Sequence, residues 1–126
     1  MAGFLAVFVG AGLGGAARHA INLWLPQPSW IPVLASTLFV NLLGGLLAGV
    51  LYAALGPAWL KTQPLGLFLM TGVLGGLTTF SAFTAEGATL LVERPALALL
   101  QAALHVLGCL AAFWLGSRLY MACAAP

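Results

Sequence analysis

The chain has 126 residues, of which 63% are hydrophobic and 5% are charged, and its net charge is +2 at pH 7. A soluble globular domain carries about 25% charged residues, so this composition excludes one and predicts a membrane protein. The few basic residues are scattered, which argues against nucleic-acid binding because that needs clustered Lys and Arg. Residues 19–60, 62–85 and 95–117 contain no acidic or basic residue. Each of these blocks exceeds the roughly 20 residues that span a bilayer.

The first transmembrane helix is expected over residues 3–25, because Pro26 and Pro28 end any helix that reaches them. No basic residue precedes Arg18, which favours a retained helix over a cleaved signal peptide. Arg18 comes late in this helix and should lie near one membrane face. Two interpretations of Arg18 are open: a snorkelling side chain at the interface, or a charge that faces the vestibule of a pore.

The second helix is expected over residues 33–55, before Pro57, and Trp24 and Trp30 flank the preceding loop as interface anchors. Small and polar residues recur along this helix at spacings of three and four, which places them on one face. Asn41 lies among them, and an unsatisfied side-chain amide in an apolar medium costs roughly 2–7 kcal/mol. Asn41 therefore either bonds a neighbouring helix or faces a path filled by water or ions.

The third segment, expected over residues 65–92 after a polar loop at 59–63, departs from an ordinary membrane helix. Gly75 and Gly76 weaken a helix, and the hydroxyl side chains that follow can bond backbone carbonyls in place of the helical ladder. We therefore expect the segment to come apart at this glycine pair, with a break near residues 75–79. Carbonyl oxygens freed by such a break suit a monovalent cation such as Na⁺.

Beyond the expected break, Phe80, Phe83 and Glu86 recur every third residue and share one helix face. Paired aromatic residues at this spacing are typical of plain packing, but here they alternate with the hydroxyls of Thr79 and Ser81. A carboxylate inside a membrane span is a candidate functional group. The alternative for Glu86 is a position already close to the membrane surface.

The fourth helix is expected over residues 96–121. His105 within it is either a hydrogen-bonded packing residue or a proton carrier. Cys109 and Cys123 have no ligand-like spacing to a histidine, which predicts unpaired thiols. We expect no enzyme active site, because no nucleophile, base and orienting acid come together at a plausible spacing.

The charged residues do not orient the chain in a membrane. With four spans, Lys61 and Arg118 lie on one side and Arg18 and Arg94 on the other, so the positive-inside rule favours neither orientation. A chain without such a bias can insert both ways and pair with its own inverted copy. Four short helices also enclose little volume, so a conduction path is expected between two copies. The expected fold is an all-α subunit of four transmembrane helices, assembled as an antiparallel, dual-topology homodimer in a lipid bilayer.

Three motifs carry a resemblance to a known family. They are Gly12-Leu-Gly-Gly-Ala-Ala-Arg18, Thr37-Leu-Phe-Val-Asn-Leu-Leu-Gly44 and Gly75-Gly-Leu-Thr-Thr-Phe-Ser-Ala-Phe83. With these motifs the chain resembles the Fluc (CrcB) fluoride ion channels over essentially its whole length. The resemblance implies a multi-pass protein of the inner (plasma) membrane that exports fluoride passively from the cytoplasm and so lowers its toxicity. It also implies two pores per dimer and a structural Na⁺ at the dimer centre, held by the backbone carbonyls of Gly75 and Thr78 of both subunits.

The same resemblance implies roles for side chains. Asn41 would donate its amide to fluoride, the phenylalanine pair would line the passage, and the hydroxyls and the carboxylate would form a polar track. The implied pore residues are Asn41, Phe80, Phe83, Ser81, Thr79 and Glu86, with Arg18 in the vestibule. The chain departs from the family pattern at Ala82, where the family usually has Thr, and at His105 and Cys109, where Asn or Tyr and Ser are frequent.

Two other classes of protein are alternatives to a channel. A small multidrug transporter, which exports cations, needs a carboxylate deep in its first helix, and no acidic residue precedes Glu86 in this chain. A structural membrane subunit without transport of its own would leave the hydroxyl residues of the third segment unexplained.

Overall fold

The computed structural model describes residues 1–25 and 36–125. Within them, four helical segments are long and apolar enough to cross a membrane. These segments are Ala2–Trp24, Ser36–Leu55, Pro64–Glu93 and Pro95–Ala124. Pro26, Pro28, Trp30 and the expected start of the second helix at residue 33 lie outside the described residues.

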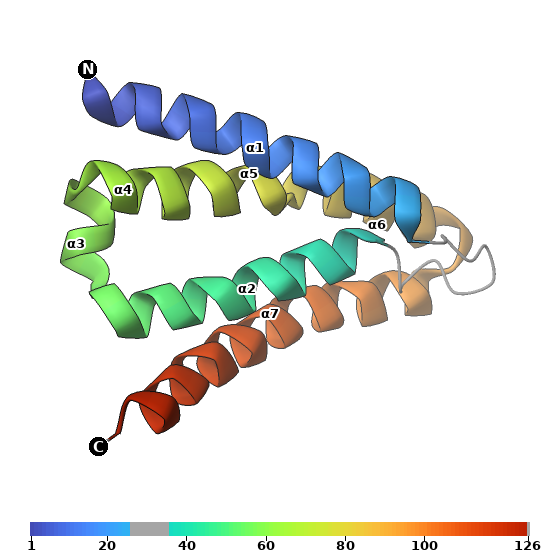
Figure 1. Cartoon of the computed structure of the whole chain (residues 1–126). Coiled ribbons are helices and arrows are strands. Elements are labelled where there is room, and N and C mark those ends of the chain that lie inside the picture. Colours follow the sequence, from blue (N-terminus) through green and yellow to red (C-terminus); the bar gives the residue numbers. More distant parts are fainter. Residues whose placement is uncertain (26–35, 126) are drawn as a thin grey trace.

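Three of the four segments are single helices, and the third is composite. The single helices are α1 (Ala2–Trp24), α2 (Ser36–Leu55) and α7 (Pro95–Ala124). The composite segment contains α4 (Pro64–Gly66), η2 (Leu67–Leu74), α5 (Gly75–Leu77) and α6 (Phe80–Glu93). In Figure 1, α1 lies along α4 to α5, α2 lies below them and α7 crosses beneath α2. Both termini lie at the end of the molecule where α3 (Pro57–Thr62) joins α2 to α4.

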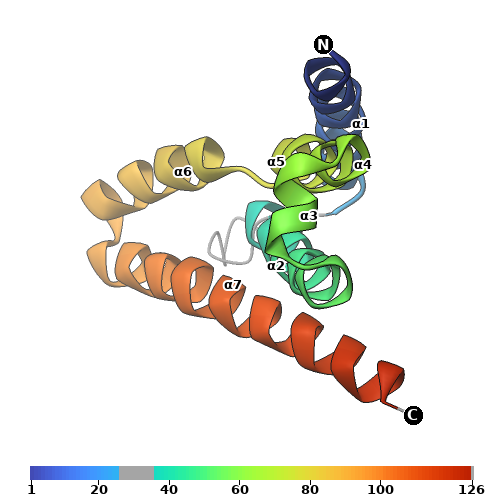
Figure 2. The ribbon, with the colours of Figure 1, turned by 90° about the vertical axis from the view of Figure 1, so that its left-hand side faces the viewer.

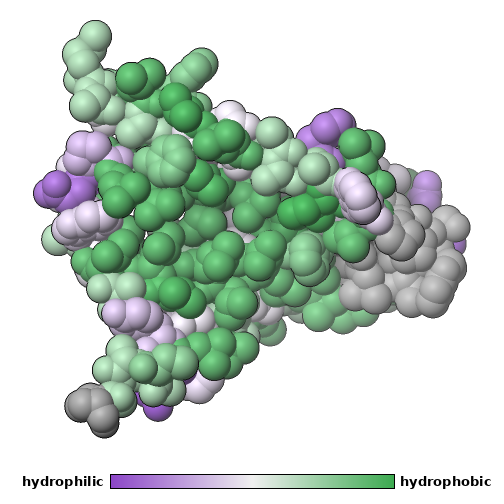
Figure 3. Space-filling model, in the orientation of Figure 1, coloured by the Kyte–Doolittle hydropathy of each residue, from purple (hydrophilic) through white to green (hydrophobic). Residues whose placement is uncertain are grey.

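Apolar side chains cover most of the visible face of the molecule, and the polar residues gather toward its ends (Figure 3). Large hydrophobic residues are exposed on the outer helices, for example Phe4 and Phe8 on α1 and Leu107 and Trp114 on α7. A surface of this kind matches hydrocarbon rather than water, since isolated apolar patches on soluble monomers are far smaller. The chain is therefore a multi-pass helical membrane protein.

The prediction of a polar loop at residues 59–63 is wrong, because most of these residues belong to the short helix α3. Gly56 has a φ of 76°, a conformation that favours glycine, and it turns the chain out of α2. Pro57 then occupies the first turn of α3, where its missing N–H costs nothing. Local backbone chemistry thus replaces the loop by a compact helical connection.

The third segment differs from expectation in two further respects. Leu67–Leu74 is not an α-helix but the π-helix η2, whose hydrogen bonds follow the wider i+5 register. The interruption lies within the expected range of residues 75–79 but not at the glycine pair, since Gly75 and Gly76 lie in α5. The extended residues are Thr78, with ψ 158°, and Thr79, with φ −151° and ψ 119°.

The glycine pair of α5 has a packing role in place of the expected conformational one. A Cβ on Gly76 would clash with the carbonyl oxygen of Ala11 on α1, so this glycine allows the two backbones to touch. Gly14 on α1 is in the same situation against the carbonyl oxygen of Val73. Small residues at helix contacts are how membrane helices gain close van der Waals packing.

Glycines also join α2 to α7. A Cβ on Gly49 would clash with the carbonyl oxygen of Phe113, and a Cβ on Gly116 would clash with that of Leu46. The two helices therefore cross with their backbones in contact. A small core of Val40, Leu74 and Leu77 fills the space between α2 and the third segment.

Beyond Thr79 the chain changes direction. Figure 2 shows α6 leaving the layer of α1 and α5 and lying against the first half of α7. Leu90 of α6 and Ala98 of α7 are the buried residues of this contact. The junction between the two packed halves of the molecule thus falls at Thr78 and Thr79.

The glycine contact between α2 and α7 predicts a stability difference between two Gly→Ala substitutions. Gly116→Ala should lower the free energy of unfolding by about 1–3 kcal/mol, because the added methyl meets a backbone carbonyl that cannot rotate away. Gly12→Ala is the control, since a Cβ at Gly12 meets nothing within 4 Å. Unfolding in detergent micelles, followed by helical circular dichroism, measures both. Equal loss for the two variants would contradict the packing role.

Candidate functional site: a cavity beside the interrupted third segment

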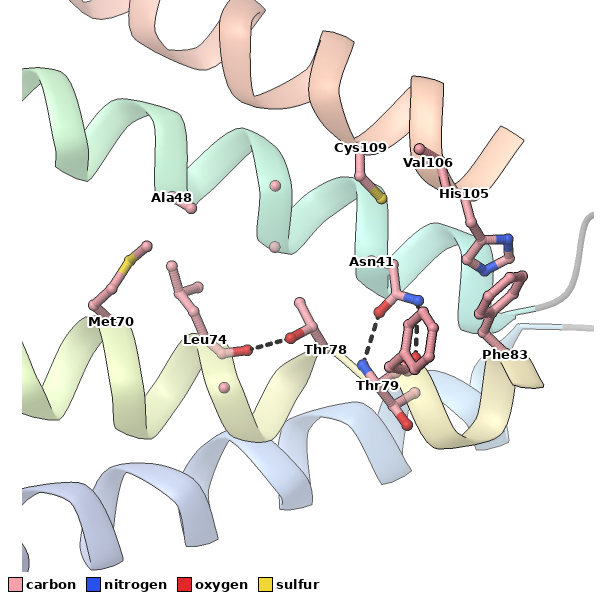
Figure 4. Close-up of a pocket in the computed structure, with 14 residues that line it drawn as sticks. Asn41, Ala48, Met70, Leu74, Thr78, Thr79, Phe83, His105, Val106 and Cys109 are labelled. Atoms are coloured by element: carbon pink, nitrogen blue, oxygen red, sulfur yellow. Dashed lines mark hydrogen bonds between the residues drawn. The ribbon is translucent and has the colours of Figure 1, made fainter. Parts of the chain in front are cut away.

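A cavity of about 390 Å³ lies where the third segment changes direction, between α2, α5, α6 and α7. Figure 4 shows side chains from these elements converging on it. Its polar and aromatic lining comes from Asn41, Thr78, Thr79, Phe80, Phe83, His105 and Cys109. These groups are all uncharged or, for His105, able to be neutral, so the cavity offers hydrogen-bonding groups without a fixed charge.

The Asn41 side chain takes the place of the helical hydrogen-bond partners that the backbone of Thr79 lacks. Its Nδ2 donates to the carbonyl oxygen of Thr79 at 3.0 Å, and the Thr79 amide nitrogen donates to Asn41 Oδ1 at 2.7 Å (Figure 4). Thr79 is buried, with 8% of its surface exposed, so both of its backbone groups need partners. Asn41 thus bonds a neighbouring segment, as one interpretation expected, and it lines the cavity as well. The Thr79 carbonyl uses one of the two hydrogens on Nδ2.

Thr79 also starts the next helix. Its Oγ1 accepts a hydrogen bond from the Ala82 amide nitrogen at 3.2 Å, which makes Thr79 the N-cap of α6. The Ser81 hydroxyl lies 3.2 Å from the same oxygen. One extended residue is therefore held from two sides, by α2 through its backbone and by α6 through its side chain.

The interruption deprives two backbone carbonyls of their usual helical donors. In a continuous helix the carbonyl of Gly75 accepts from the amide of Thr79, and that of Thr78 accepts from the amide of Ala82. Here those two amides donate to Asn41 Oδ1 and to Thr79 Oγ1 instead. Gly75 and Thr78 both line the cavity. Carbonyl oxygens released from the helical ladder are the hard ligands that alkali cations accept, so these two residues fit the expected Na⁺ site.

Aromatic rings close the other side of the cavity. The ring centroids of Phe80 and Phe83 lie 5.2 Å apart, and Phe83 lies 4.4 Å from the His105 imidazole. The rings of Phe83 and His105 are inclined by 32°, which is close to stacking. Phe80 is 73% exposed. The predicted phenylalanine pair therefore meets as a pair and borders the cavity.

Glu86 is held by polar side chains from two other helices. Thr37 Oγ1 on α2 donates to Glu86 Oε1, and Gln101 Nε2 on α7 donates to Glu86 Oε2 at 3.1 Å. Gln101 is fully buried, at 0% exposure. Sequence reasoning passed over Gln101, although a lone side-chain amide in the 30-residue apolar helix Pro95–Ala124 was a signal that could have found it. These bonds tie α6 to both α2 and α7.

The structure brings together some of the predicted site residues and leaves others outside the cavity lining. Asn41, Thr78, Thr79, Phe80, Phe83 and Gly75 line the cavity. Ser81 and Glu86 are not among its lining residues. Ser81 is hydrogen-bonded to the lining residue Thr79, and Glu86 accepts hydrogen bonds from Thr37 and Gln101. Arg18 is half-buried on α1 and is not a lining residue.

The histidine and the cysteines also have defined environments. His105 Nδ1 lies 3.0 Å from the backbone carbonyl oxygen of Gln101, one helical turn earlier. Cys109 and Cys123 are free thiols, which confirms the prediction that they are unpaired. Among residues 1–25 and 36–125, no group of three or more His, Cys, Asp or Glu side chains is placed to hold a metal ion.

The fold and the site together define a multi-pass helical membrane protein with a cavity of neutral hydrogen-bonding groups beside an interrupted span. The chain belongs to the CrcB family: residues 5–117 match the family described as CrcB-like protein, Camphor Resistance (CrcB). This confirms the family resemblance expected from the three motifs.

Its relatives include proteins named as channels. It is 46% identical to a fluoride-specific ion channel FluC of Variovorax paradoxus over 128 residues, which covers 96% of each chain. It is also similar to proteins of the same name from Aromatoleum aromaticum, at 45% identity over 94% of this chain and 91% of that one, and from Methylobacterium nodulans, at 48% identity over 86% and 84%. The family is therefore one of ion channels and not of enzymes.

The bonds between Asn41 and Thr79 predict a large cost for their removal. Asn41→Leu should lower the free energy of unfolding by about 2–4 kcal/mol, because both buried backbone groups of Thr79 lose their partner. Asn22→Leu on α1 is the control, since Asn22 Oδ1 is buried without a hydrogen-bond partner among the described residues. Unfolding in micelles measures both variants. A loss at Asn41 no greater than at Asn22 would show that Thr79 does not depend on this side chain.

The partners of Glu86 predict that its shape matters more for folding than its charge. Glu86→Gln should change the free energy of unfolding little, because Gln101 can rotate its amide and accept from the new amide with Oε1, an atom that has no partner in the described structure. Glu86→Leu should cost about 2 kcal/mol, because the side chains of Thr37 and Gln101 then lose their acceptor. The same unfolding assay separates the two. Equal losses would mean that the carboxylate charge is what counts.

Proposed function

We propose that this protein is a fluoride-selective channel that lets fluoride leave the cytoplasm passively and so lowers its toxicity. The observation that carries the proposal is the cavity in which the Asn41 amide, the hydroxyl residues of the interruption and the rings of Phe80 and Phe83 meet. Membership of the CrcB family and the names of the relatives support the choice of ion.

The chemistry of the lining suits a small, strongly hydrated anion. A pore must replace the water around fluoride with hydrogen-bond donors, yet bind the ion weakly enough to release it. The amide of Asn41 and the hydroxyls of Thr79 and Ser81 donate without carrying a positive charge. Phenylalanine rings have an electropositive edge, so Phe80 and Phe83 can offer ring C–H groups to an anion and keep the passage narrow.

The proposed position of the interruption is the middle of the bilayer. Thr78 and Thr79 are the fifteenth and sixteenth of the 30 residues in Pro64–Glu93, the third span. Extended backbone at that depth requires protein cover or a polar cavity, because hydrocarbon offers its N–H and C=O groups no partner. Asn41 and the cavity meet that requirement from within the subunit.

The proposed assembly is an antiparallel homodimer in the plasma membrane, with pores between the inverted copies. The balance of Arg18 and Arg94 against Lys61 and Arg118 supports dual topology. The exposure of Phe80, at 73%, supports a partner subunit beside the cavity.

Labelling of Cys123 in intact cells with a membrane-impermeant thiol reagent should modify only part of the protein. A C-terminus on the same side of the membrane in every copy would contradict this assembly.

The proposed structural cation is a Na⁺ at the dimer centre, bound by the carbonyls of Gly75 and Thr78 from both subunits. The redirected amides of Thr79 and Ala82 support this choice, since they leave those carbonyls without their helical donors. When bound, the ion supplies positive charge that offsets the cost of holding anions nearby. Arg18 is proposed to attract anions at the mouth of the pore, and Glu86 to belong to the polar track within it.

The test is ion release from liposomes that contain the purified protein, read with fluoride-selective and chloride-selective electrodes. Fluoride release that exceeds the release from protein-free liposomes, with no chloride release, is the expected result. Release of both anions would make the protein an unselective anion channel. Retention of fluoride inside the liposomes would contradict the proposal.

The phenylalanine ring nearest His105 provides a sharper prediction. Phe83→Ile should reduce fluoride flux by at least about tenfold while the protein still assembles, because a branched alkyl side chain has no electropositive edge. Phe4→Ile is the matched control, since Phe4 is 85% exposed on α1 and does not line the cavity. Flux is normalised to the amount of assembled protein, determined by size-exclusion chromatography. Unchanged flux in Phe83→Ile would exclude a role for the ring edge.

A further inference from the structure

We propose that Gln101 is a positioning residue of the fluoride path: it holds the Glu86 carboxylate of the polar track outside the cavity lining, so that the negative charge is directed away from the ion. The inference rests on the proposed function, because it needs the cavity to lie on the path of an anion. Gln101 itself does not touch fluoride in this proposal, since it is fully buried and does not line the cavity.

Glu86 lies one helical turn from the cavity wall. It follows the lining residue Phe83 by three positions on α6, so the two side chains share a helix face. Thr37 and Gln101 each precede a lining residue of their own helix by four positions. The three helices therefore place a second layer of polar side chains beside the layer that lines the cavity. One turn rises about 5.4 Å, which is within the reach of a glutamate side chain that has no partners.

Both carboxylate oxygens of Glu86 are held by donors that do not line the cavity. Oε1 accepts from the Thr37 hydroxyl, and Oε2 accepts from Gln101 Nε2 at 3.1 Å. Thr37 is 4% exposed and Gln101 is 0% exposed. Side chains buried in a packed interior have little freedom to move, so these two bonds fix the direction of the carboxylate.

The orientation of the Gln101 amide matches an ionised carboxylate. Its NH₂ group faces Glu86, and its Oε1 is buried without a partner among the described residues. The reverse orientation would place Oε1 against a carboxylate oxygen, acceptor against acceptor. A Cβ on Gly87 would lie 3.1 Å from Gln101 Oε1, so this glycine leaves room for the amide. Keeping a second donor on Glu86 therefore costs one unsatisfied buried acceptor.

The direction of this charge matters to an anion. Helix α2 contains no basic residue, and the one basic residue of α7 is Arg118, in its second half, so neutral groups hold Glu86. Like charges a few Å apart repel strongly in an interior of low dielectric constant. A carboxylate that turned into the cavity would oppose the entry of fluoride. A carboxylate bonded outside the lining leaves the neutral donors of the cavity free for the ion.

The test is a double-mutant cycle on fluoride flux with Gln101→Met, which removes the amide and keeps a long, unbranched side chain. In the parent protein this substitution should lower flux by about tenfold, because the freed carboxylate repels the anion. In a Glu86→Gln background it should lower flux by less than about twofold, because no charge is left to position. Gln63→Met is the control and should leave flux unchanged, since Gln63 is exposed at the end of α3. Flux is normalised to the amount of assembled protein.

An infrared measurement follows the carboxylate without transport. Glu86 and Glu93 are the two acidic residues of the chain. In Glu93→Gln protein, the Glu86 band is therefore isolated by subtracting the spectrum of protein that also carries Glu86→Gln. Adding Gln101→Met should shift this band, because one carboxylate oxygen loses its donor.

The two readouts separate the failures. Equal loss of flux in the two backgrounds would show that Gln101 supports the fold and not the placement of charge, and unchanged flux in Gln101→Met would equally overturn the proposal. If the parent releases no fluoride, the proposed function fails. The infrared band then decides the remaining point: a shift confirms that Gln101 holds the carboxylate, and a band that stays in place overturns this role as well.

Discussion

The structure depends on a side-chain amide that stands in for a backbone one. In an apolar medium every peptide N–H and C=O must be paired within the protein, so a helix that stops inside a membrane needs substitute partners. Asn41 carries a donor and an acceptor on one planar amide, and it pairs with both backbone groups of Thr79. Without that pair both backbone groups of the buried Thr79 would lose their partner.

The consequences of this pair spread in both directions along the third segment. Toward the C-terminus, the fixed Thr79 caps α6 and lets it turn away toward α7. Toward the N-terminus, the redirected amides release the carbonyls of Gly75 and Thr78. One short interruption therefore creates a new helix direction, two carbonyls without their helical donors and the cavity beside them. Interrupted membrane helices in transporters use the same physical device.

Glycine contacts make the frame on which the interruption rests. Gly14 and Gly76 bring α1 against the third segment, and Gly49 and Gly116 bring α2 against α7. Between α2 and the third segment the close contact is made by Gly44, where a Cβ would clash with the Thr78 side chain, and by the core of Val40, Leu74 and Leu77. Glu86, bonded by Thr37 and Gln101, ties α6 into the frame from the far side. The polar groups that remain on the cavity wall are neutral donors and acceptors, which suits an ion that must pass through rather than stay.

Sequence and tertiary structure contributed different parts of this picture. Composition and the uncharged blocks alone determine a membrane protein with four spans, because burial in lipid tolerates so few charges. The motif from Gly75 to Phe83 placed an irregularity near residues 75–79, and together with the motifs of the first two helices it carried the resemblance to the family.

Only the tertiary structure decided which residues of that motif are extended and why. Local propensity pointed to Gly75 and Gly76, but their role is to admit the backbone of α1, whose residues are some sixty positions earlier in the chain. Thr79 is extended because Asn41, on another helix, offers it a partner. The hydrogen bond from Gln101 to Glu86, and the contact of His105 Nδ1 with the backbone carbonyl of Gln101, also arise only from folding. Sequence shows which positions can leave the helix, whereas contacts between distant segments determine which of them do.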